Sequence, residues 1–268
     1  MSRYSGIIET IFHRKHSSGM IRVSFSRTEF DEVATELGFA RIKNLGDIVY
    51  SFRYRASLPQ SIQESAPLGY EWIILGAGTA EYEFRLANNG KVSISPHRTE
   101  IKIPDATPEI LKHYAPGTDE QALLTKVRYN RLIDIFTGLT CYSLQNHYRT
   151  TVPIIGQVEV DEIYIGISKN GAHYVLPCQA KSPGDSFGIA QVYQDMALCI
   201  YRYPDARCRP IGIQFMSINS VAILELKVVE EDEIFSLSIT EEKHYKLVPR
   251  GSIDSSDLQD YLIQDNIE

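Results

Sequence analysis

Residues 157–181 read QVEVDEIYIGISKNGAHYVLPCQAK, and this stretch decides the fold expected for the chain. Its first half, 157–167, is rich in Val, Ile and Tyr, which favour strands, and its second half, 173–180, is extended again. Between the halves, Lys169, Asn170 and Gly171 form a turn signal. The pattern therefore predicts two adjacent antiparallel strands joined by a tight turn.

Side chains on such strands alternate between the two faces of the sheet. Glu159 and Asp161 share one face of the first strand, and Gln179 and Lys181 share one face of the second. Paired side by side, the strands bring two acids, an amide oxygen and an ammonium group together at one edge of a sheet. An apolar hairpin has no packing reason to collect these groups at its ends.

Carboxylate and amide oxygens suit a hard cation such as Mg²⁺, which keeps several waters and takes oxygen ligands from one or two acids. Such an ion polarises a phosphate and lowers the pKa of a bound water, and a lysine beside it orients the water or stabilises the transition state. The residues therefore indicate a metal-dependent phosphodiesterase. The alternative is a solvated surface with a weak salt bridge. The apolar run before Gln179 favours the site, because it places the polar pair at the end of a buried strand.

The order of Asp161, seventeen residues and then Gln179-x-Lys181 resembles the motif of the PD-(D/E)XK nuclease superfamily. The glutamine in place of the second acid is most similar to the Mrr-type branch of restriction enzymes. The resemblance covers about residues 119–230 and implies an α/β fold, with an α/β/α restriction-endonuclease-like core around a central mixed sheet. It also implies that Asp161, Gln179 and the carbonyl of Ala180 bind Mg²⁺, for which Mn²⁺ substitutes. Lys181 would then act on the water or on the transition state.

A glutamine in the motif leaves the site with one negative charge fewer, so a further carboxylate is expected to contribute. Glu159 is one candidate, because it shares a strand face with Asp161. Glu120 is the other, because nucleases of this superfamily often take one acid from a helix that precedes the catalytic strands. Helix N-termini also favour acids for purely structural reasons.

Residues 28–54 have the pattern of two short helices. Capping residues precede FDEVATEL at 30–37, Gly38 is suited to end that helix, and a second helix is expected at 44–54. This spacing is typical of a helix-turn-helix, although any helical hairpin with a glycine turn has it. The segment is therefore either a DNA-binding element or a scaffold. The side chains expected to contact DNA are Tyr50, Arg53 and Arg55, with Gln191 from a later helix.

The remaining patterns outline the domain organisation. Alternating apolar residues predict a strand pair within 5–24, and further strands are expected between 70 and 95. Two helices followed by a β-hairpin are the order of a winged helix. We therefore expect an N-terminal α+β, winged-helix-like recognition domain at 1–100, a proline-rich linker at 101–118 and a nuclease domain at 119–268.

Composition limits the class of protein. The chain of 268 residues is 43% hydrophobic and 23% charged, which is ordinary for a globular protein. No apolar run approaches the roughly 20 residues that span a bilayer, and the N-terminus lacks the apolar core of a secretory signal, so we expect no membrane contact and a cytoplasmic location. The four cysteines lack CxxC spacing and indicate neither a zinc site nor a disulfide framework.

The net charge of −7 is unevenly distributed. Residues 1–150 carry 18 Lys and Arg against 16 Asp and Glu, whereas residues 151–268 carry 9 against 18. A mildly basic recognition end and an acidic catalytic end are compatible with a metal nuclease.

Together these features predict a Mg²⁺-dependent endodeoxyribonuclease of restriction type. The expected partners are double-stranded DNA and a second copy of the chain in a homodimer. One alternative is a repair or recombination nuclease that acts on branched or damaged DNA. The other is a winged-helix DNA-binding regulator that has a nuclease-like fold and no activity.

Overall fold

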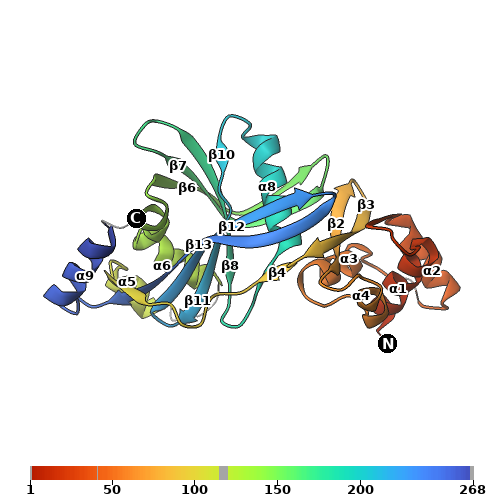
Figure 1. Ribbon diagram of the computed structural model, residues 1–268, viewed down its shortest axis with the longest axis horizontal. Coiled ribbons are helices and arrows are strands. Elements are labelled where there is room, and N and C mark those ends of the chain that lie inside the picture. Colours follow the sequence, from red (N-terminus) through yellow and green to blue (C-terminus); the bar gives the residue numbers. More distant parts are fainter. Residues whose placement is uncertain (1, 41, 115–119, 266–268) are drawn as a thin grey trace.

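The computed structural model describes residues 2–40, 42–114 and 120–265. The molecule is elongated: the N-terminal helices lie at one end, the C-terminal helix α9 (Ser255–Asp265) lies at the other, and a large sheet connects them (Figure 1). Within the described ranges no helix is both long and apolar enough to cross a membrane.

Eleven strands of the described residues form one mixed sheet. Its path runs through β1 (Arg22–Ser26), β3 (Glu81–Asn88), β13 (Ile234–Val248), β12 (Ser220–Glu231), β11 (Ile211–Ser217), β8 (His173–Lys181), β7 (Gly156–Ile167) and β6 (Thr140–Val152). Three strands lie off this path: β2 (Glu71–Gly78) pairs with β3, β5 (Glu100–Pro104) with β13, and β10 (Arg207–Cys208) with β8. Because β8 is parallel to β11 while most neighbours are antiparallel, the predicted α/β class with a mixed sheet is confirmed.

Helices cover both faces of the sheet around β7 and β8. On one face, α6 (Glu120–Tyr129) and α7 (Leu132–Thr137) pack on Leu176, Cys178 and Ala180 of β8. On the other face, α8 (Ile189–Arg202) packs on β7 and β8. The chain from Glu120 to Thr137 forms two helices and not one continuous helix, because Arg131 has a φ of 50° and separates α6 from α7. A left-handed residue ends the run of helical hydrogen bonds.

The N-terminal segment has the order α1 (Arg3–Lys15), β1, α2 (Thr28–Glu36), α3 (Gly46–Tyr54), α4 (Gln60–Glu64), β2 and β3. The two helices predicted within 28–54 are confirmed as α2 and α3. The strand pair predicted within 5–24 is wrong in its first half, which forms α1. Ile7, Ile8, Ile11 and Phe12 are all buried, and this spacing is a helical stripe that the alternation of the flanking residues obscured.

The stretch expected as a linker contains regular structure. Residues 100–104 form β5, which lies parallel to β13, and residues 109–114 form α5 (Glu109–Tyr114). Residues 115–119 lie outside the described ranges. A second, two-stranded sheet joins β4 (Lys91–Val92) to β9 (Phe187–Gly188). The chain on both sides of the expected linker therefore belongs to shared sheets.

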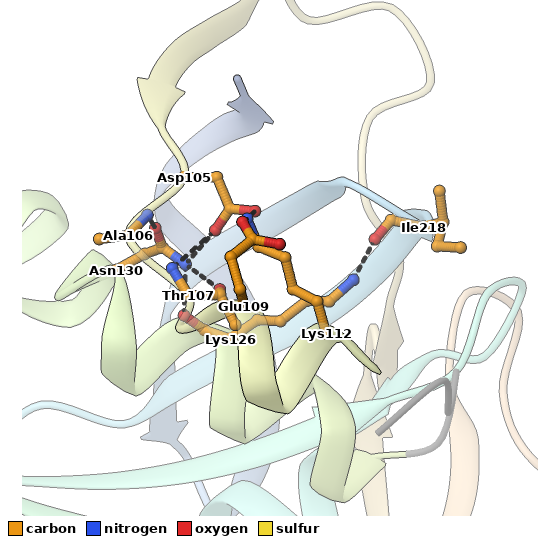
Figure 2. A network of polar contacts seen from close by, with 8 residues as sticks. All are labelled: Asp105, Ala106, Thr107, Glu109, Lys112, Lys126, Asn130 and Ile218. Atoms are coloured by element: carbon orange, nitrogen blue, oxygen red, sulfur yellow. Dashed lines mark hydrogen bonds and ion pairs between the residues drawn. The ribbon is translucent and has the colours of Figure 1, made fainter. Parts of the chain in front are cut away.

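A buried asparagine fixes the segment after β5 to the end of α6. Asn130 accepts a hydrogen bond from the backbone nitrogen of Ala106 at 2.7 Å, and its own amide nitrogen donates to Thr107 Oγ1 at 3.0 Å and to the carbonyl of Lys126 at 2.9 Å. Figure 2 shows this network, in which Lys126 also reaches the carbonyl of Ile218 in the β11–β12 turn. Since α6 begins at Glu120, these contacts help to set the position of that acid.

Candidate functional site

The predicted hairpin of residues 157–181 is present as β7 and β8. Their ladder runs from Ile167 opposite His173 to Glu162 opposite Cys178. One residue beyond the ladder, Oδ2 of Asp161 accepts the backbone N–H of Ala180 at 2.8 Å. A carboxylate therefore bonds to the neighbouring strand at the point where the polar residues begin.

A cleft of about 1030 Å³ opens at this end of the hairpin. It is bordered by α3, the β2–β3 turn, the adjacent parts of β6 and β7, and the segment that leads into α8. Every residue that the sequence nominates for catalysis or DNA contact, except Ala180, lines it: Tyr50, Arg53, Arg55, Glu120, Glu159, Asp161, Gln179, Lys181 and Gln191. Ala180 is fully buried in the core between β8 and α6. The fold thus gathers residues that are far apart in the sequence, such as Arg53 and Gln194, which are 141 positions apart.

The charged residues that line this cleft come from two parts of the chain. Among the described lining residues, each charged residue before position 100 is a cation: Arg27, Arg53, Arg55 and Lys91. The acids all come from the later part of the chain: Glu120, Glu159, Asp161 and Asp185. Lys181 and His147 lie among these acids. The cleft therefore presents cations that suit a polyanion as well as acids that suit a cation.

Of the three acids on β7, Glu162 is fully buried, whereas Glu159 and the partly buried Asp161 line the cleft. Burial raises the pKa of Asp161 above the ordinary value, against the hydrogen bond from Ala180 and the charges of Lys181 and His147, which lower it. Glu159 instead forms an ion pair with Arg149 of β6, with 2.8 Å between Oε1 and Nη2. The ionised form of a carboxylate that is partly desolvated at the wall of a cleft is stabilised when a cation approaches it.

The side chain of Gln179 is held from behind by α8. Only 2% of the residue is exposed; its nitrogen donates to Asp195 Oδ2 at 2.8 Å, and its oxygen accepts from Gln191 at 2.7 Å. Asp195 is fully buried, which raises its pKa well above the ordinary value, and its Oδ1 has no hydrogen-bond partner. The amide of the motif thus has a fixed orientation.

Three residues near the site were not nominated by the sequence. Gln194 and Asp195 share with Gln191 the i, i+3, i+4 spacing of one helical face, so a polar stripe inside an otherwise apolar helix was the signal. His147 lies on β6, for which no strand was predicted, and it has a φ of 45°. Arg128 of α6 does not line the cleft, because it pairs with the buried Glu162 on the opposite face of the sheet.

The oxygens at the cleft determine which ion fits. Among the residues that the structure describes, no group of three or more His, Cys, Asp or Glu is arranged to hold a metal ion. This donor set does not suit zinc, which prefers several nitrogen and sulfur ligands in a closed tetrahedron. It suits Mg²⁺, which keeps most of its waters and needs only one or two carboxylates. Asp161 would supply the first of these, with Glu159 and Glu120 on the same cleft.

Comparisons of the chain with protein-family models, with curated proteins and with solved structures find no significant match.

Proposed function

We propose that the chain is a Mg²⁺-dependent endodeoxyribonuclease of restriction type, related to the PD-(D/E)XK superfamily. One observation carries the proposal: the motif residues Asp161, Gln179 and Lys181 line the same cleft as a row of cations from the N-terminal segment. The acids suit a metal ion, and the cations suit the phosphates of its substrate.

The arrangement of elements supports this assignment. Helices on both faces of the sheet around β7 and β8 are compatible with an α/β/α restriction-endonuclease-like core. In the N-terminal segment, β1 and β2 both pair with β3, and α2 and α3 precede the β2–β3 hairpin. This is the order of a winged helix, in which α3 would be the helix that reads DNA, through Tyr50, Arg53 and Arg55.

Residues of the cleft would hold Mg²⁺, and the chemistry it would supply when bound is polarisation of the scissile phosphate and a lower pKa for the attacking water. Asp161 would hold the ion through Oδ1, because Oδ2 already accepts the N–H of Ala180. Gln179 would add its side-chain oxygen, whose second lone pair remains after the bond from Gln191. The resemblance also implies the carbonyl of Ala180 as a ligand, but Ala180 is fully buried and does not line the cleft, so it does not fit that role.

The ammonium of Lys181 would orient the water and stabilise the charge that develops on the phosphate. Glu159 or Glu120 would supply the negative charge that the glutamine of the motif lacks. Each chain offers one such cleft, so two copies in a homodimer would cut the two strands of a duplex.

The decisive experiment is incubation of the protein with methylated and unmethylated plasmid, with Mg²⁺ or Mn²⁺ and with EDTA. We expect cleavage in either metal and none in chelator. Asp161→Ala should abolish cleavage while retaining DNA binding in Ca²⁺, and a branched DNA substrate in parallel identifies a repair nuclease. Cleavage that continues undiminished in EDTA, or in Asp161→Ala, would contradict the proposal.

A DNA-binding regulator without activity is the second candidate. It is favoured by the bond from Gln191 to Gln179, which occupies one lone pair of an expected metal ligand. This alternative predicts that plasmid is bound but never cut, and that Asp161→Ala leaves binding unchanged with and without metal.

A further inference from the structure

A chain of hydrogen bonds connects α3 to β7 through the side chain of Gln194 on α8. The hydroxyl of Tyr54, on α3, donates to Oε1 of Gln194 at 2.6 Å. The amide nitrogen of Gln194 donates in turn to the carbonyl of Glu159 at 3.2 Å. Burial raises the pKa of Tyr54 to about 12, so its hydroxyl keeps its proton and remains a donor at neutral pH.

The chain of bonds ends at the predicted metal site. Glu159 stands two residues before Asp161, and its carbonyl lies 3.5 Å from the side-chain nitrogen of Gln179. Gln194 is only 3% exposed and uses both ends of its amide. In such an environment, a buried polar group that loses its partner bears the cost of its desolvation without compensation. The backbone before Asp161 is therefore tied to the position of α3.

The same side of α3 lines the cleft, where Tyr54 itself lies with its ring centre 5.0 Å from that of Tyr50. Tyr50, Arg53 and Arg55 belong to the lining, and the guanidinium of Arg55 lies 4.7 Å from the centre of the Tyr50 ring. The helix is anchored to the N-terminal core by Ile48 and Val49, which are buried there. The Tyr54 hydroxyl is not part of that core, so it is not needed to fold the N-terminal segment.

We propose that Tyr54 and Gln194 are positioning residues that couple DNA engagement by α3 to the geometry of the metal site. The inference rests on the proposed nuclease function. When α3 is held by DNA, its bond through Gln194 fixes the Glu159 carbonyl and with it the strand that carries Asp161. By linkage, bound metal must then strengthen DNA binding by the same factor by which DNA strengthens metal binding.

The test uses Tyr54→Phe, which removes only the hydroxyl, with Tyr201→Phe on the exposed side of α8 as the matched control. DNA affinity is measured without metal and with Ca²⁺, and single-turnover cleavage is measured in Mg²⁺ at saturating DNA. For Tyr54→Phe we expect metal-free affinity within about twofold of wild type, whereas the gain in affinity from Ca²⁺ and the cleavage rate both fall by about 5- to 50-fold. The control should match wild type in all three.

Gln194→Glu is the second variant, because it keeps the acceptor for Tyr54 and replaces the donor to Glu159 by a carboxylate oxygen. It should show the same loss of coupling, and thermal unfolding checks that both variants are folded. Wild-type coupling and cleavage in Tyr54→Phe would overturn the inference alone. So would weaker metal-free binding with an unchanged rate at saturation, which would make Tyr54 a simple DNA contact. A wild type that neither cuts DNA nor responds to metal would overturn the proposed function, and the inference with it.

Discussion

The side-chain nitrogen of Gln179 donates a hydrogen bond to Oδ2 of Asp195 at 2.8 Å, and both residues are almost completely buried. The glutamine of the motif is therefore matched to an acid sixteen residues away on α8. Gln179→Glu would replace the N–H donor by a carboxyl oxygen and set two acids against each other, which repel once both are ionised. We expect it to lower the free energy of unfolding by about 1–3 kcal/mol, with a larger loss at higher pH.

The double variant Gln179→Glu/Asp195→Asn restores a donor opposite the new acid. It should recover most of the lost stability and reach half-maximal cleavage at a lower Mg²⁺ concentration than wild type, because the charge at the ion increases. Chemical denaturation of the four proteins of this cycle gives the interaction energy. Additive effects of the two substitutions would contradict the pairing.

Asp161→Asn should abolish cleavage without destabilising the protein. Asparagine still accepts the N–H of Ala180, and the raised pKa of Asp161 means that its ionisation opposes folding. Between the ordinary pKa and the raised one, the folded state binds more protons than the unfolded state, so wild-type stability falls as pH rises through this window. In metal-free buffer the variant should be more stable than wild type above the window and equal to it below. A stability gain that is the same at every pH would argue against this origin.

Lys181→Met should lower the cleavage rate at saturating Mg²⁺ by about 10²- to 10³-fold, as expected for loss of a group that stabilises charge in the transition state. DNA affinity in Ca²⁺ should change little, because the other cations of the cleft remain. Lys169→Met, in the turn between β7 and β8, is the matched control and should cut at the wild-type rate. Equal rates for both variants would remove Lys181 from the mechanism.

Arg128→Met should destabilise the protein by about 2–4 kcal/mol, because Glu162 is fully buried and would keep only its bond from Ser143. Arg149→Met breaks an ion pair whose arginine is 66% exposed and screened by solvent, so it should cost much less stability than Arg128→Met. Urea unfolding of the two variants provides the comparison. A similar small loss for both would show that the buried pair of Arg128 and Glu162 contributes no more stability than the exposed one.

Local pattern was sufficient for the parts of the fold that follow from a single period. Alternation together with a glycine turn predicts β7 and β8, and a capped apolar stripe predicts α2. The same reasoning is wrong at residues 5–15, because Ile7, Ile8, Ile11 and Phe12 fit a helix while their neighbours also fit a strand. Strand β6 has many exposed polar residues and lies at the end of the sheet beside β7, so no alternating pattern of apolar residues predicts it.

The candidate site was predictable where chemistry and spacing coincide, as at Asp161 and Lys181. Gln194 and Asp195, which lie behind the candidate site, were not predictable from the sequence, because their roles depend on contacts between distant segments. Gln194 lies on α8, and its partner Tyr54 lies 140 residues earlier in the sequence. The hydrogen bond between them therefore cannot be inferred from the sequence around either residue. Similarly, Asp195 could be placed beside Gln179 only once α8 was seated on the sheet.

The outer side of β13 takes partners from two separate segments: Phe235 and Ser236 pair with β3, and residues 244–248 pair with β5. A fragment of residues 119–268 would lack both partners and would expose a row of backbone N–H and C=O groups along that edge. Unpaired edges of this kind recruit other chains and cause aggregation. Replacement of the N-terminal segment by that of another protein would therefore have to include β5 in the transferred piece, or provide a substitute strand. The boundary for protein engineering lies after Pro104, beyond the end of the N-terminal core.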